Sequence, residues 1–120
     1  MDDKQFEKVH SELYKLRQAV KLGPLHSLAV IELAREFYSE PQRRAYLEDY
    51  SGMRREADNL KLAHTKAARD TQERDDAWTA YAAAYERAKE FAAKHPLIHE
   101  LYEARRELCN RDHLGRFDYQ

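Results

Sequence analysis

The sequence is poor in the residues that interrupt regular structure, with three glycines and three prolines among 120 residues. Average usage of roughly 7% and 5% would give about fourteen of them. This shortage excludes a collagen-like chain and a Gly/Pro-rich disordered one. It also argues against a turn-dense all-β fold, which needs a turn signal about every 8–12 residues. The composition therefore predicts an all-α protein.

Other absences bear on where in the cell the protein is found and on what it binds. The single cysteine, Cys109, cannot form a disulfide within the chain, and no run of about 18 apolar residues predicts a membrane span. The N-terminus has the features of neither a signal peptide nor a transit peptide. The net charge of −1 argues against direct binding to nucleic acid or to an anionic membrane. We therefore expect a cytoplasmic protein.

The apolar residues that are present predict a thin core. They make up 42% of the chain, but many are alanine and tyrosine rather than leucine, isoleucine and valine. Such a core leaves apolar surface for another subunit to bury. We expect a homo-oligomer, with a dimer favoured, whose other partner is a protein.

Apolar spacing predicts two helices in the first third of the chain. The first, over about 3–22, has a stripe of five residues at the 3-4 spacing of a coiled-coil seam: Phe6, Val9, Leu13, Leu16 and Val20. Gly23 and Pro24 end it. The second, over about 25–38, is apolar on most sides, which predicts the most enclosed helix of the fold.

Residues 41–95 allow two structures. Ser39 and Gln42 form a capping box that starts a helix, and proline next occurs at Pro96. A heptad pattern follows, apolar at both ends and polar around 69–76. The chain either continues as one helix of ~55 residues and ~80 Å, or turns near 69–76 into an antiparallel hairpin, with Asp70 and Glu73 capping the second arm. The prediction favours the hairpin.

A last helix is predicted over about 96–112, because Pro96 disfavours helical geometry at His95. The C-terminal tail, residues 113–120, is expected either to dock on the bundle or to be disordered. The prediction is therefore one all-α domain over residues 1–112, an antiparallel helical bundle or hairpin of four to five helices with coiled-coil-like seams.

No residue pattern predicts catalysis, a metal or a cofactor. His95 with His99, and Cys109 with His113, are i,i+4 pairs, but about 15 Å of helix separates the pairs, so one metal cannot join them. The sequence has no phosphate-binding loop, nucleophile elbow or zinc-protease signature. We expect no catalytic residues, no metal ligands and a non-enzymatic protein.

Two sets of side chains are candidates for protein contacts. The paired arginines Arg43, Arg44, Arg54 and Arg55 form either a solvated, salt-bridged face or a face for an acidic partner. The aromatic set Tyr46, Tyr50, Trp78, Tyr81 and Tyr85 either packs in the core or binds another subunit, since Tyr and Trp are enriched at interface centres. In a hairpin, Trp78, Tyr81 and Tyr85 are expected to face the first arm. With the N-terminal stripe, these aromatics are the predicted protein interface.

Residues 89–108, KEFAAKHPLIHELYEARREL, resemble the last helix of the YlbF/YmcA family of small helical bacterial proteins. The shared features are the His95-Pro96 break, the apolar pair after it, and the spacing from Ala104 to Leu108. Residues 30–58 are similar to the family's first-helix pattern. The resemblance covers about residues 30–110. It implies an all-α oligomer that acts as a regulatory adaptor, contacts proteins including RNA-processing machinery, and has no catalytic activity.

The predicted function is a self-associating, non-enzymatic interaction module, most simply a regulatory adaptor. The alternative is a small phage- or mobile-element-type inhibitor that docks on a nucleic-acid-processing enzyme through its charged faces.

Overall fold

The computed structural model describes residues 3–19 and 24–111, which form five helices and no strand within those ranges. They are α1 (Asp3–Ala19), α2 (Pro24–Phe37), α3 (Glu40–Lys66), α4 (Gln72–Lys94) and α5 (Pro96–Arg111). The helices pack on one another, so the predicted all-α fold is confirmed. The predicted tail, residues 113–120, lies outside the described residues.

The break between α2 and α3 is the predicted capping box. The Ser39 backbone N–H donates to Gln42 Oε1 at 3.0 Å, and the Gln42 backbone N–H donates to Ser39 Oγ at 3.3 Å. The two side chains thus satisfy amide groups that have no partner inside the helix. Pro41 is tolerated beside them, because a first-turn residue needs no amide hydrogen.

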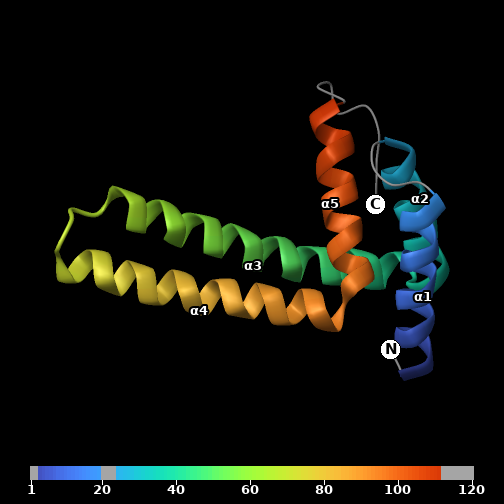
Figure 1. Ribbon diagram of the computed structural model, residues 1–120, viewed down its shortest axis with the longest axis horizontal. Coiled ribbons are helices and arrows are strands. Elements are labelled where there is room, and N and C mark those ends of the chain that lie inside the picture. The colour runs from blue at the N-terminus through green and yellow to red at the C-terminus, as the bar shows by residue number, and fades with distance from the viewer. Residues whose placement is uncertain (1–2, 20–23, 112–120) are drawn as a thin grey trace. The chain divides into compact units, whose positions relative to one another are not determined.

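Between α3 and α4 the chain turns, which confirms the hairpin and excludes the single long helix (Figure 1). The non-helical link is Ala67–Thr71, a little before the predicted segment 69–76. Asp70 has a φ of 61°, a left-handed conformation that aspartate tolerates better than most residues. The hairpin therefore turns without glycine or proline.

The residue that caps α4 differs from the prediction. Thr71 Oγ1 accepts a hydrogen bond from the Arg74 backbone N–H at 3.2 Å, and the Thr71 hydroxyl donates to the Ala68 carbonyl at 2.7 Å. Threonine caps a helix as aspartate does. The prediction that Asp70 starts the cap was wrong by one residue, because Asp70 supplies the left-handed turn just before it.

The chain divides into two compact units, one of residues 1–47 and 95–120 and the other of residues 48–94. The division falls inside α3 and between α4 and α5. The single domain expected over 1–112 stays a prediction.

The first unit has its core on α5. Leu97, Ile98 and Leu101 are fully buried, and the buried apolar residues of this unit outside α5 are Val9, Leu13, Val30, Ile31, Ala34, Tyr38 and Leu47. Within this unit α5 packs most extensively on α2, and α1 contacts both.

Helix α2 is not the most enclosed helix, and that prediction was wrong. It buries one side, but Leu25 is 72% exposed and Leu28 is 46% exposed. A helix in a unit of this size has too few neighbours to cover all its faces, so an apolar side is left open.

The second unit is the α3–α4 hairpin, and its core is made mainly of small residues. The buried side chains within residues 48–94 are Tyr50, Ala57, Ala84 and Ala88. Tyr50 stacks on Phe91 with 5.3 Å between ring centroids and 13° between planes, and Arg87 donates to Glu56 at 3.0 Å. Figure 1 shows the two arms side by side and antiparallel.

Candidate functional site

A row of aromatic rings lies along the hairpin. It consists of His64 from α3 and Trp78, Tyr81 and Tyr85 from α4, and we name it the aromatic face. Successive ring centroids are 5.1, 5.7 and 6.0 Å apart. Trp78 is 55% exposed and Tyr85 is 50% exposed. Each ring thus contacts the next one in the row, while Trp78 and Tyr85 expose about half of their surface to solvent.

Trp78 meets the first arm at His64, as expected, but Trp78 and Tyr85 each leave about half of their surface in solvent and are therefore not packed in the seam. In α3 the predicted seam holds, since Tyr50 and Ala57 are buried. In α4 the buried positions are Ala84 and Ala88, so Trp78 and Tyr85 lie one position beside the seam. The turn at Ala67–Thr71 interrupts the heptad, and each arm sets its own register.

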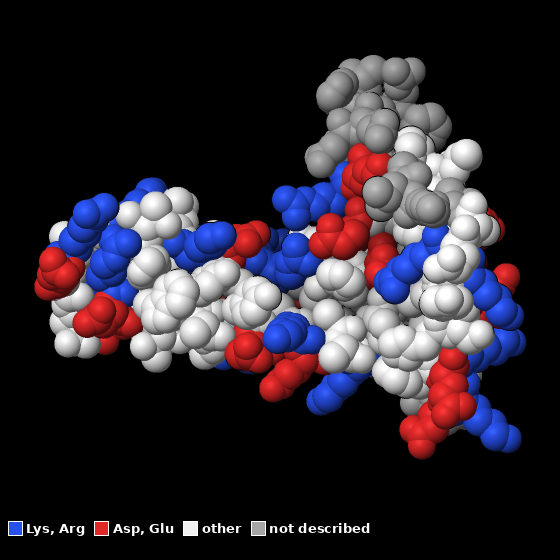
Figure 2. Space-filling model, viewed as in Figure 1, with Lys and Arg blue, Asp and Glu red and all other residues white. Residues whose placement is uncertain are grey.

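Charged side chains of both signs lie one helical turn from the aromatic face on α4, where Arg74 and Asp75 precede Trp78 and Lys89 follows Tyr85. Figure 2 shows an uncharged band along the hairpin with Lys, Arg, Asp and Glu around it. Arg74 Nη1 donates to the Ala67 carbonyl at 3.1 Å, and the Arg87–Glu56 pair links the arms. An apolar centre with a charged border is the composition of protein–protein interfaces.

A second open surface is a groove between α1 and α2, with a volume of about 470 Å³. Apolar side chains and charged ones both line it: Leu16, Ala19, Ala29 and Leu33, with Glu12, Lys15, Glu32 and Glu36. We name it the α1–α2 groove. The sequence analysis did not predict it, although the apolar sides of residues 25–38 were a signal for it.

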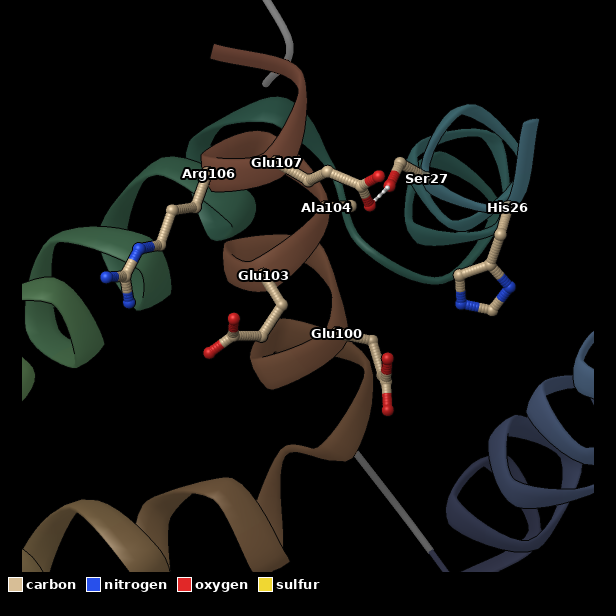
Figure 3. A pocket seen from close by; sticks show the side chains of 7 residues that line it. All are labelled: His26, Ser27, Glu100, Glu103, Ala104, Arg106 and Glu107. Atoms are coloured by element: carbon tan, nitrogen blue, oxygen red, sulfur yellow. Dashed lines mark hydrogen bonds between the residues drawn. The ribbon is translucent and has the colours of Figure 1, made fainter. Parts of the chain in front are cut away.

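A third feature is a polar pocket of about 350 Å³ between α2 and α5 (Figure 3). Ser27 Oγ donates to Glu107 Oε2 at 2.8 Å, and the two side chains point toward each other. Glu100, which also lines the pocket, is paired with Arg17 of α1. These polar contacts hold α1, α2 and α5 together, and we assign the pocket a structural role.

Tyr38 lies in the link between α2 and α3, with its hydroxyl oxygen buried and without a hydrogen-bond partner among the described residues. Its ring meets that of Tyr46 edge-on, with centroids 5.6 Å apart, and Tyr46 in turn lies 4.6 Å from the His95 ring. Burial, and secondarily the Tyr46 hydroxyl, raise the pKa of Tyr38 to about 12. The native structure thus favours the neutral phenol.

Stability is expected to fall as pH rises above 10, since the unfolded chain then loses the Tyr38 proton while the native chain keeps it. With pKa values of about 10 unfolded and about 12 native, the loss at pH 11 is about 1.4 kcal/mol. Urea denaturation at pH 8 and pH 11 measures it. Tyr38→Phe should remove this part of the pH dependence, and the exposed control Tyr14→Phe should keep it. Equal losses in both variants would contradict the assignment.

The predicted N-terminal seam is divided between the interior and the surface. Val9 is fully buried and Leu13 is 2% exposed, so the chain uses both in its own core. Phe6 is half-buried, and Leu16 lines the α1–α2 groove. Val20 lies outside the described residues. Of this seam, only Leu16 and Phe6 are accessible to a partner in the described part of the chain.

Most of the predicted arginine face is engaged within the chain. Arg43 donates to the Tyr38 carbonyl at 2.7 Å, Arg44 pairs with Glu40 at 2.6 Å, and Arg54 donates to the Tyr50 hydroxyl at 3.1 Å. These contacts fit the solvated, salt-bridged alternative. A role toward an acidic partner stays a prediction.

The histidines and the cysteine considered for a metal are not brought into one group. His95 lies between α4 and α5, where its carbonyl accepts the His99 backbone N–H at 3.1 Å, and Cys109 is an exposed thiol on α5. His113 lies outside the described residues. Over residues 3–19 and 24–111, the structure contains no set of three His, Cys, Asp or Glu side chains placed to hold a metal ion.

Within the same described ranges, none of the helices combines the length and the apolar character needed to cross a membrane. Comparison with family models, with curated proteins and with solved structures found no match to this chain.

Proposed function

We propose that this chain is a non-enzymatic interaction module that self-associates through the aromatic face and serves as a regulatory adaptor. The observation that carries the proposal is the exposure of Trp78 and Tyr85, at 55% and 50%, in a row of contacting rings. Tryptophan and tyrosine contribute most of the binding energy at many protein interfaces, because they bury large areas at little entropic cost.

The thin core of the hairpin supports the proposal that a second copy of the chain covers the aromatic face. Its buried residues include three alanines, and a two-helix unit covers only one side of each helix. Small units with little core commonly gain stability by oligomerisation. Two hairpins placed face to face form a four-helix arrangement in which each aromatic face covers the other, as a two-fold interface requires.

The balance of charge around the face also favours self-association. Arg74, Asp75 and Lys89 lie one helical turn from its rings, so a two-fold axis can bring a basic residue of one copy near an acidic residue of the other. A face of one sign would repel its own copy. The adaptor role follows from pairing this surface with a second one that binds another protein.

The test is the oligomeric state of a surface variant. Trp78→Ser with Tyr85→Ser removes only exposed rings, so the fold is expected to survive. Light scattering after size exclusion, over about 10–500 μM, should show a dimer for the wild type. The dimer dissociation constant should rise about 100-fold in the double variant, which corresponds to the loss of about 2.7 kcal/mol typical of interface hot spots.

Tyr14→Ser is the matched control, because Tyr14 is 65% exposed and lies on α1, outside the hairpin. It should leave the dimer unchanged. A wild-type chain that is strictly monomeric at the highest concentration overturns the proposal. A dimer that is insensitive to the Trp78 and Tyr85 changes places the interface elsewhere and also overturns it.

A further inference from the structure

The α1–α2 groove has the shape and lining of a site for a helix. Its residues on α1 extend from Glu12 to Ala19, and those on α2 from Ala29 to Glu36. Each wall is thus seven residue steps long, roughly 10 Å or two helical turns at 1.5 Å per residue. A third helix laid between two others is a common mode of peptide recognition, with apolar anchors spaced at i, i+3 or i+4, and i+7.

The apolar part of the groove continues along α2. Leu25, Ala29 and Leu33 follow one another at a spacing of four residues and therefore share a face of the helix. Leu25 is 72% exposed, and Leu33 is half-buried in the groove. This stripe lies opposite the buried side of α2, which contains Val30, Ile31 and Ala34. The side of α2 that its own unit leaves open is thus apolar enough to bind a partner.

The charges that line the groove decide which partner fits. Three of the lining residues are glutamates, and one, Lys15, is basic. Lys15 Nζ lies 3.5 Å from Glu12, and Arg35 pairs with Glu32 at 2.8 Å. Glu36 has neither an ion pair nor a hydrogen bond within the described part of the chain. The lining charge is negative, and the Glu36 carboxylate is open to a cationic ligand.

We propose that the α1–α2 groove binds a basic amphipathic helix of a partner protein. Leucine-type side chains of that helix occupy the space between Leu16 and Leu33, and its lysines or arginines pair with Glu36 and Glu32. A second copy fits less well, since two copies of this acidic lining repel each other. An anionic membrane surface is disfavoured for the same reason. The inference supplies the partner chemistry for the proposed adaptor, and it uses a surface separate from the aromatic face.

The probe is a fluorescein-labelled peptide of about 16 residues that forms a helix, has leucines at the i, i+4 and i+7 positions of one face, and has lysine and arginine beside them. A second peptide with glutamate at every basic position is the comparison. Fluorescence anisotropy at low salt should show saturable binding of the basic peptide, and binding of the acidic peptide at least ten-fold weaker. Binding should weaken as salt screens the charges.

Two charge reversals of the same kind locate the site. Glu36→Lys should weaken binding of the basic peptide about ten-fold or more. Glu7→Lys makes the same charge change at an exposed position of α1 that does not line the groove, and it should change binding less than two-fold. Leu33→Ser should weaken binding of both peptides, and circular dichroism of the variant should show that it keeps its helical fold. No binding at about 1 mM peptide, or equal effects of Glu36→Lys and Glu7→Lys, overturns the proposal.

The experiment separates this inference from the proposed self-association. If the peptides bind as expected while the chain stays monomeric, the groove proposal holds and the aromatic-face proposal fails. If Glu36→Lys or Leu33→Ser instead dissociates a dimer, the groove is an interface between copies and the proposed partner helix is overturned.

Discussion

Ala84→Glu is expected to unfold the hairpin or to lower its free energy of unfolding by roughly 3 kcal/mol or more, because it places a carboxylate in the seam between α3 and α4. Ala84 is 1% exposed in a core whose other buried members are Tyr50, Ala57 and Ala88. The longer, charged side chain does not fit between the arms without pushing them apart.

Ala83→Glu is the matched control, since Ala83 is the preceding residue and is exposed. It is expected to change stability by less than about 0.5 kcal/mol, as most surface substitutions do. Urea denaturation followed by Trp78 fluorescence measures both variants, and the signal reports the hairpin because Trp78 is the only tryptophan. If the two variants lose stability equally, the register of α4 in the seam is wrong.

This result also bears on the proposed self-association. The half-exposed positions of Trp78 and Tyr85 follow from the same register that buries Ala84 and Ala88. A variant that loses the seam should therefore lose the dimer together with the fold. The double serine variant should lose the dimer alone, so the two measurements separate folding of the hairpin from recognition by it.

Leu101→Ala is expected to lower the free energy of unfolding of the first unit by about 2–5 kcal/mol. Leu101 is fully buried at the centre of α5, between Leu97 and Ala104, which are also buried. Truncation removes apolar contacts and leaves a cavity that packed neighbours fill only in part. Against a typical total stability of about 5–15 kcal/mol, this loss is large.

Leu28→Ala makes the same chemical change at a side chain that is 46% exposed. It should cost less than about 1 kcal/mol. Thermal unfolding by far-UV circular dichroism should show the melting temperature of Leu101→Ala lowered by roughly 10–20 °C and that of Leu28→Ala nearly unchanged. Similar shifts in both variants would mean that α5 is not the core of its unit.

Leu101→Ala further controls the groove experiment. Since α5 packs on both α1 and α2, the variant should lose binding of the basic peptide when it is warmed past its lowered melting temperature, where the wild type still binds. Binding that survives a fully unfolded first unit would mean that the peptide is held by charge alone and not by the folded groove.

Helix ends were predicted more accurately than helix partners, for a physical reason. The capping box of Ser39 and Gln42 and the break before Pro96 depend on bonds and steric contacts within four residues. Such signals are complete in the local sequence. The turn at Ala67–Thr71 was harder to place, because it uses a left-handed aspartate where a glycine or an asparagine would have been a clear signal.

The surfaces could be predicted only in part. The sequence identified the aromatic side chains Trp78, Tyr81 and Tyr85 and suggested that they bind a subunit, but its heptad placed Trp78 and Tyr85 in the seam. It assigned Val9 and Leu13 to a protein interface, whereas the chain buries both in its own core. It did not predict the α1–α2 groove, since no local pattern says which two helices leave a gap between them.

The amino-acid sequence is enough to predict that the chain is all-α, where most helices begin and end, and which residues are apolar enough to be buried. Those properties follow from backbone conformation, capping and side-chain spacing, all of which act locally. The folded chain was needed to establish that α3 and α4 form a hairpin, that Ala84 is buried while Trp78 and Tyr85 are half-exposed, and that α2 leaves an apolar side open beside Glu36. Those properties depend on contacts between residues far apart in the chain, where packing of one helix on another selects among faces that the sequence alone makes nearly equal.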